Sequence, residues 1–184
     1  MGKAKHYSYR MDKDTGFAPH IQSGLCTLCG CKTKSIEKLA MAGSLVVGIG
    51  GNNTGKPNML IYAMKVKEAL PFREFSTRYQ RQADYYNNHK KKTRPDARVL
   101  VSRHFYYFGD RAKRLPEPKL SNVIHRGRGC KRLKDGDIAL LNKFLCAYIR
   151  GRALGKPNNP PDAPTARTKP MDKSTGSRIC KSSC

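Results

Sequence analysis

Two apolar segments joined by a short polar one constrain the fold of this chain more than any other feature. Residues 45–49, LVVGI, and 59–67, MLIYAMKVK, are short and apolar, as β-strands of a protein core are. Alternate residues of a strand point to opposite faces. On residues 59–67 both faces are largely apolar, since Met59, Ile61 and Ala63 share one face and Leu60, Tyr62, Met64 and Val66 share the other. We therefore expect residues 59–67 to lie centrally in a sheet.

The polar segment between these strands imitates a nucleotide-binding loop. From Gly50 to Lys56 the spacing is G-x-x-x-x-G-K, but Pro57 stands where the magnesium-binding hydroxyl belongs. The residues that follow are β-like and do not open the helix whose N-terminus would bind phosphate. Asn52 and Asn53 tolerate left-handed backbone, so we predict a hairpin turn here.

The remaining elements follow from periodicity. Residues 5–10 and 98–108 read as strands, and 33–42 and 72–81 as short helices. Residues 137–150 carry an apolar stripe at helical spacing behind a capping Asp135 or Asp137, which predicts a helix. Residues 80–98 are polar, with Lys90, Lys91 and Lys92 together, and are interpreted as a basic loop.

Length and composition indicate one domain over residues 1–150, followed by a Pro-rich basic tail over residues 151–184. The tail has too little apolar surface to fold, so we expect it to be disordered. No apolar run approaches the roughly 20 residues of a membrane span, and residues 1–11 lack the apolar segment of a signal peptide. We expect a cytoplasmic protein; the sequence does not indicate its oligomeric state.

The chain is strongly cationic. It carries 37 Lys and Arg against 13 Asp and Glu, a formal net charge of +24. Most of this charge belongs to residues 1–150, so a basic tail alone does not explain it. A folded basic surface is typical of nucleic-acid-binding proteins, with an anionic membrane surface as the less favoured partner.

An aromatic run next to several arginines supports that interpretation. Phe105, Tyr106, Tyr107 and Phe108 stand in one stretch with Arg103 and Arg111, and Arg126 and Arg128 follow among glycines. Exposed rings can stack on bases, and guanidinium groups match phosphate oxygens. The alternative is that the rings of a strand simply face the core, with either Phe105 and Tyr107 or Tyr106 and Phe108 pointing inward.

Seven cysteines without an export signal indicate thiols rather than disulfides. Cys26, Cys29 and Cys31 form a C-x-x-C-x-C cluster, but structural zinc has four ligands, and the fourth would have to be remote, at Cys130 or His125. Partly buried thiols explain the cluster better than a zinc site does. We therefore predict neither a metal nor a cofactor.

Seven segments together resemble one protein family. They are GFAP (16–19), LCTLCGCK (25–32), GSLVVGIG (43–50), LIYAMKV (60–66), SRHFYYFGD (102–110), LP (115–116) and HRGRG (125–129). In this order, across about residues 6–150, the set resembles the second type of nucleotide modification associated domain, found in bacteria and phages. The resemblance implies an association with systems that hypermodify DNA bases and brings no established catalytic residue. Ser44, where the family usually has an acid, and Cys130, often His in the family, depart from its pattern.

The order of elements predicts an α+β fold. A short apolar strand, a turn, a long strand and a helix suggest a small mixed β-barrel with flanking helices, similar in order to PUA-like folds, which include readers of modified bases. In such a barrel, residues 11–24, 26–32 and 103–108 would surround one cleft.

The leading functional hypothesis is a nucleic-acid-binding module that recognises a modified or flipped base, with DNA favoured over RNA as its partner. The predicted binding residues are Phe17, Lys32, Arg103, His104, Tyr107, Arg126, Arg128 and Lys131. The alternative is an enzyme of base hypermodification, with His104 or His125 as general acid or base and Cys26 or Cys31 as nucleophile. A third possibility is a phage factor that is purely structural or binds a host protein and has neither activity.

Overall fold

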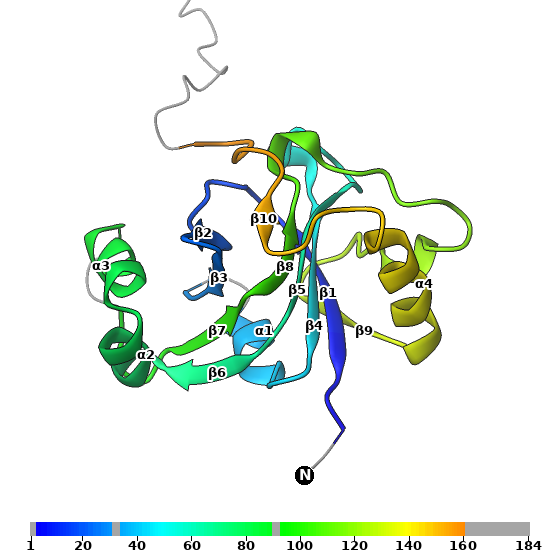
Figure 1. Ribbon diagram of the computed structural model, residues 1–184. Coiled ribbons are helices and arrows are strands. Elements are labelled where there is room, and N and C mark those ends of the chain that lie inside the picture. The colour runs from blue at the N-terminus through cyan, green and yellow to red at the C-terminus, as the bar shows by residue number, and fades with distance from the viewer. Residues whose placement is uncertain (1–2, 31–33, 90–92, 161–184) are drawn as a thin grey trace, which may run out of the picture.

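Two β-sheets make up the fold, with three of the four described α-helices on their outer faces (Figure 1). The computed structural model describes residues 3–30, 34–89 and 93–160. The first sheet has six strands, in the order β10 (Arg152–Ala153), β8 (His104–Tyr107), β5 (Leu60–Lys65), β4 (Leu45–Gly50), β1 (His6–Met11) and β9 (Cys130–Leu133). The second has four strands, in the order β2 (His20–Gln22), β3 (Leu25–Leu28), β7 (Arg98–Ser102) and β6 (Glu68–Pro71).

One long hairpin joins the two sheets. Its first arm runs through β5 into β6 and its second through β7 into β8, so that β5 pairs with β8 in one sheet and β6 with β7 in the other. At the bend the Lys67 amide donates to the Val101 carbonyl at 2.8 Å, and the Ser102 hydroxyl donates to the Lys65 carbonyl at 2.6 Å. These bonds keep the two arms together where the chain changes sheet.

The predicted small mixed β-barrel of PUA-like order is wrong. Within the described residues, β9 and β10 are the edges of the six-stranded sheet, and β2 and β6 are the edges of the four-stranded sheet. A barrel needs the edge strands to pair, and instead the strands are stacked as two open layers whose inner faces share a core. The mixture of strands and helices is nevertheless of the α+β kind.

Three apolar clusters form the core. The first lies between the sheets and contains Tyr9, Leu28 and Phe105, together with Ile36 of α1 (Lys34–Leu39). The second packs α4 (Asp135–Leu145) on the outer face of the six-stranded sheet, and the third packs α2 (Phe72–Arg78) and α3 (Gln80–His89) on the outer face of the four-stranded sheet. In Figure 1, α4 and the α2–α3 pair accordingly lie on opposite sides of the molecule.

The hairpin predicted at residues 45–67 is confirmed. Strands β4 and β5 pair antiparallel, and a 3-10 turn, η1 (Asn52–Thr54), connects them. Gly55 ends the turn at φ 71°, in the left-handed region that glycine adopts without strain. Strand β5 lies between β4 and β8, and both of its faces are buried, as the sequence pattern requires.

The basic loop predicted over residues 80–98 is wrong for its first ten residues, which form α3. Ala83 and Tyr86, three residues apart, lie on one face of this helix and are buried in the third cluster. The Tyr86 hydroxyl lies 2.8 Å from Thr27 Oγ1, which anchors the helix to β3. Lys90, Lys91 and Lys92 lie outside the described residues.

The first ten residues of the predicted tail are ordered. Strand β10 pairs parallel with β8, and the Leu154 amide donates to the Tyr107 carbonyl at 2.8 Å. Farther on, Asn158 and Asn159 bond to Asp14 in the loop after β1. Residues 151–160 therefore pack on the domain, and residues 161–184 lie outside the described part. Among the helices that the structure describes, none has the length and apolar character needed to cross a bilayer.

Candidate functional site

Two adjoining cavities open at one end of the six-stranded sheet. Their volumes are about 340 Å³ and about 460 Å³, within the range of small-molecule sites. Both are lined by Gly43, Lys65, His104 and Arg150. Because they share these walls, we call them together the basic cavity.

The register of the strands brings the polar residues of the cavity into one row. Leu45 pairs with Lys65, which in turn pairs with His104, so one residue from each of three strands stands at the same end of the sheet. His6, at the start of β1, completes the row, and its Nδ1 accepts the Leu45 amide at 2.9 Å. This bond leaves Nε2 as the nitrogen that carries the proton of neutral His6.

The inner part of the cavity is apolar. The sheet contributes Ala63 and Tyr106, and α4 contributes Ile138 and Leu145. His104 and Tyr106 share a face of β8 because side chains alternate along a strand, and their rings meet edge to face with centroids 6.0 Å apart. A planar apolar group could therefore pack beside Tyr106, which is 8% exposed.

Exposed cations form the rim of the cavity. Lys65 and Lys67 come from the end of β5 and the bend after it, Arg103 lies between β7 and β8, and Arg150 follows α4. The Gly151 amide donates to the Phe105 carbonyl at 2.8 Å and so ties Arg150 to the sheet. Among the described residues that line the cavity there is no carboxylate. The rim therefore favours an anion.

The two histidines of the cavity are neutral at pH 7. Burial lowers the pKa of His104 below its ordinary 6.5, and the neighbouring charges of Arg150 and Lys65 lower it further. Burial is also the main cause that lowers the pKa of His6, although Asp135 opposes it. The positive charge of the site at neutral pH therefore comes from lysine and arginine. In the neutral His104 ring one nitrogen is unprotonated and can accept a hydrogen bond.

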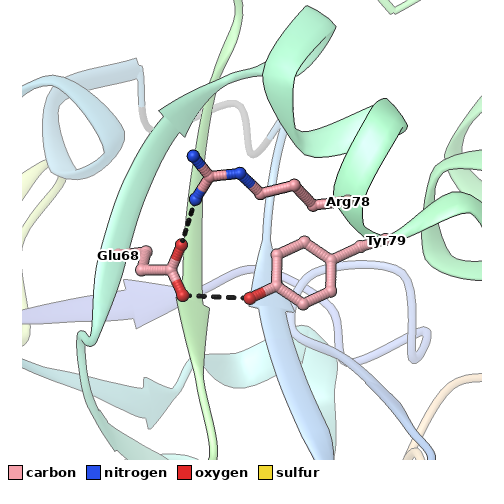
Figure 2. Close-up of polar contacts among 3 residues, drawn as sticks. All are labelled: Glu68, Arg78 and Tyr79. Atoms are coloured by element: carbon pink, nitrogen blue, oxygen red, sulfur yellow. Dashed lines mark hydrogen bonds and ion pairs between the residues drawn. The ribbon is translucent and has the colours of Figure 1, made fainter.

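Glu68, the carboxylate that follows the rim residue Lys67 in sequence, is bonded to two residues at the end of α2. Figure 2 shows that it accepts Arg78 Nη1 at 3.1 Å through one oxygen and the Tyr79 hydroxyl at 3.0 Å through the other. Burial and the Glu68 charge raise the pKa of Tyr79, so this hydroxyl remains a donor. Both oxygens of Glu68 are therefore already engaged, and the charge of the rim residue Arg103 also acts on Tyr79.

The structure brings two of the predicted binding residues, Arg103 and His104, together in the basic cavity. Tyr107 is not there: it is 2% exposed, and its hydroxyl donates to Asp14 Oδ1 at 2.9 Å and Oδ2 at 3.0 Å. Phe17 packs edge to face on Tyr86, with centroids 5.2 Å apart, beside α3. Lys32 lies outside the described residues.

The other three predicted residues lie elsewhere on the first sheet. Arg126 and Arg128 are exposed on the loop before β9, near Arg10, whose Nη1 donates to the Arg126 carbonyl at 2.7 Å. Lys131 is exposed on β9 opposite Ser8. The predicted residues that the structure describes are thus dispersed, and only Arg103 and His104 lie in the basic cavity.

The aromatic run is a core strand and not a stacking surface. Phe105 and Tyr107 are buried between the sheets, and Tyr106 and Phe108 are buried under α4. Both faces of β8 are therefore covered, whereas the alternative given in the sequence analysis placed only one pair of rings against the core. Tyr106 is the ring of the run that lines the cavity.

Sequence reasoning missed Lys65, Lys67 and Arg150. A signal for Lys65 and Lys67 was present in the sequence. The two lysines stand at alternate positions, and so on one face, where the apolar residues of β5 end, which marks the point at which that face becomes exposed. No comparable local signal identifies Arg150, whose place depends on the pairing of residues 152–153 with β8.

The cysteine cluster does not provide an accessible nucleophile among the described residues. Cys26 and Cys29 are fully buried, and burial raises the pKa of the Cys26 thiol far above its ordinary value. Cys31 lies outside the described residues, among which no three or more His, Cys, Asp or Glu side chains are grouped as metal ligands would be. Cys146, which sequence analysis did not single out, is exposed and lines the basic cavity.

Comparison with known proteins identifies the family. No curated protein and no solved structure matches the chain. Ser44 and Cys130 depart from the family pattern. Ser44 is buried, and its hydroxyl oxygen accepts the Met41 amide at 3.0 Å. Cys130 is half-buried. The model of nucleotide modification associated domain 2 matches residues 3–97 and 76–162, so most of the chain is covered. This protein therefore belongs to the nucleotide modification associated domain 2 family.

Proposed function

We propose that this protein binds nucleic acid through the basic cavity and holds a modified or flipped base there. The observation that carries the proposal is the convergence of Lys65, Lys67, Arg103 and Arg150 around one concavity with an apolar interior. Phosphates would lie at the cationic rim, and a base would enter beside Tyr106. This division of roles is common in proteins that read a base outside the helix stack.

The family supports the same class of ligand. Its description associates the domain with nucleotide modification, which favours DNA with an altered base as the partner. His104 could accept a hydrogen bond from a base edge, because at neutral pH its ring has an unprotonated nitrogen. Recognition of one base would thus combine ring contact with Tyr106 and a polar contact with His104.

Charge-matched variants test the binding site. Fluorescence anisotropy with a labelled 20-nucleotide single-stranded DNA should show a loss of about tenfold or more in affinity for the K65Q/R150Q variant at low salt. The control, R73Q/R81Q, removes the same charge from α2 and α3, away from the cavity, and should change affinity by less than about twofold. Equal losses in both variants would contradict the proposal.

Duplex substrates test the flipped base. Removing a base from the stack costs least where its pair is mismatched. A duplex with one central mismatch should therefore bind more tightly than the matched duplex, and Y106A should reduce that preference. A preference that is absent, or that Y106A leaves intact, would show that no base enters beside Tyr106.

A catalytic role is the second candidate, and His104 favours it. This residue lines both parts of the cavity, and its lowered pKa favours the unprotonated ring, the form that can take up a proton. Incubation with DNA containing modified bases, followed by mass spectrometry of the nucleosides, tests for reaction. A mass change that H104Q abolishes would establish catalysis. Binding without any mass change would favour a protein that recognises the base and does not alter it.

A further inference from the structure

The loop over residues 125–129, HRGRG, presents cations at the opposite end of the six-stranded sheet. Arg126 and Arg128 are exposed there. Gly129, at φ 83°, occupies the left-handed region, and His125 Nε2 lies 3.2 Å from the Arg128 carbonyl. The loop therefore has a defined conformation in which two guanidinium groups face solvent.

Arg10 fixes this loop to the sheet. One end of its guanidinium group, Nη1, donates to the Arg126 carbonyl at 2.7 Å, and Nη2 donates to Asn52 Oδ1 at 2.8 Å. Charged donors form strong hydrogen bonds, and both acceptors here are neutral, so the positive charge of Arg10 is not cancelled. Arg10 thus adds to the positive field of the loop that it holds.

Glu117, the acid that pairs with Arg126, does little to neutralise the loop. Arg126 Nη2 lies 4.0 Å from Glu117 Oε1, and the two side chains are 69% and 57% exposed. Ion pairs this exposed and this long contribute almost nothing to stability, so the Arg126 side chain can turn to another anion at small cost.

The loop and the basic cavity lie on the same face of β1. Tyr7, Tyr9 and Met11 point into the core between the sheets, so by alternation Arg10 shares a face with His6, which lines the cavity. Four strand residues separate them by about 13 Å. Lys131, opposite Ser8 on the edge strand β9, is exposed between these two positions along the strand direction.

We infer that the loop 125–129 and Lys131 form a second phosphate-contact surface, separate from the basic cavity, which makes the ligand a polynucleotide strand and not a free nucleotide. The inference rests on the proposed function, because it needs the cavity to hold one nucleotide of that strand. A separation of about 13 Å corresponds to about four nucleotides of a stacked strand. A strand of eight to twelve nucleotides would reach both contacts, whereas a dinucleotide would reach one.

Length dependence of binding tests the inference. Isothermal titration calorimetry would compare a dinucleotide with a twelve-nucleotide single-stranded DNA on the wild type, on R126Q/R128Q and on the control R73Q/R81Q. We expect R126Q/R128Q to lower affinity for the longer DNA by about tenfold and to leave the dinucleotide unaffected, with the control unchanged. Both arginines are exposed, and thermal unfolding would check that the fold is retained.

Two results would overturn the inference. One is an unchanged affinity of R126Q/R128Q for the twelve-nucleotide DNA; the other is an equal loss for both lengths. Failure of the proposed function gives a different pattern. In that case K65Q/R150Q and the wild type would bind the dinucleotide with equal affinity.

Discussion

The Tyr107 hydroxyl donates to both oxygens of the Asp14 carboxylate, at 2.9 and 3.0 Å, inside the protein. Asp14 is 0% exposed and also accepts the backbone amide of Asn158 at 3.2 Å and its side-chain amide at 3.0 Å. This carboxylate therefore joins the loop after β1, strand β8 and the segment 151–160, the same segment that ties Arg150 to the sheet. The interaction stabilises the fold at a distance from the proposed binding site.

Removing the Tyr107 hydroxyl should destabilise the protein. In Y107F the buried carboxylate loses the one hydroxyl donor that its two oxygens share, and nothing polar replaces it. Such a loss costs about 1–3 kcal/mol. Urea unfolding monitored by circular dichroism would measure it, and Y7F, which changes a tyrosine of the same core on β1, serves as the comparison. A cost in Y107F no greater than in Y7F would show that the contact with Asp14 contributes little.

The pH dependence of stability should carry a contribution from Asp14. Burial raises the pKa of this carboxyl above its ordinary 3.8, so the folded protein binds the proton more tightly than the unfolded chain does. The contribution of Asp14 to the free energy of unfolding is therefore complete below pH 3.8. It is lost as the pH rises through the raised pKa of the folded state.

D14N, which mimics the protonated acid, isolates this contribution. The free energy of unfolding of the wild type minus that of D14N should fall as the pH rises from 3.5 toward 7. Parallel pH profiles would contradict the assigned direction of the shift.

Two Gly→Ala substitutions should have opposite effects. A Cβ at Gly48 would approach Tyr62 Cε1 at 2.3 Å and Met11 Sδ at 2.6 Å, within the core between the sheets. Overpacking of this kind costs about 1–3 kcal/mol, so G48A should unfold at lower temperature.

Gly136 of α4 has no atom within 4 Å of the corresponding position, and alanine favours a helix by about 0.5–1 kcal/mol. G136A should therefore raise the melting temperature. A melting temperature of G48A equal to or above that of the wild type would contradict the close approach.

Cys146 should report occupancy of the basic cavity. It is exposed and lines the cavity, whereas Cys26 and Cys29 are buried and Cys130 is half-buried outside it. Peptide-resolved mass spectrometry after maleimide labelling should show Cys146 modified well before Cys26 and Cys29. A dinucleotide, which is too short to reach from the cavity to the loop 125–129, should slow labelling of Cys146 and leave Cys130 unaffected. Equal protection of both thiols would place the dinucleotide outside the cavity.

The pKa of His104 tests the geometry of the cavity without a ligand. Burial, Arg150 and Lys65 lower it below 6.5, so R150Q should raise it toward that value. NMR titration of the His104 ring would measure the change, with R73Q as a control of equal charge on α2. If R150Q and R73Q shift the pKa equally, Arg150 does not lie beside His104.

Local sequence patterns were sufficient for the strands and helices with strong periodicity. The hairpin of β4 and β5 is evident from apolar strands and a turn of Asn and Gly, and α4 from its apolar stripe. Helix α3 escaped detection because its buried side includes Ala83, Gln82 and Tyr86, in a segment that otherwise resembles a polar loop. Strand β10 has two residues, and its pairing with β8 creates it.

The candidate site was predictable in part. Arg103 and His104 were identified from their place beside the aromatic run, and the structure puts both in the basic cavity. Their convergence with Lys65 and Arg150 depends on strand register and on the return of the chain after α4, which no local pattern contains. Tyr107 lies in the core instead, and the sequence does not show that both faces of β8 are covered.

The salt dependence of DNA binding tests the central claim most directly. Each cation that contacts a phosphate adds about one unit to the slope of log affinity against log salt concentration. Measured on a 20-nucleotide single-stranded DNA, the slope of K65Q/R150Q should be shallower than that of the wild type by about two units, with R73Q/R81Q unchanged. A slope of K65Q/R150Q equal to that of the wild type would show that the cations of the basic cavity do not contact nucleic acid.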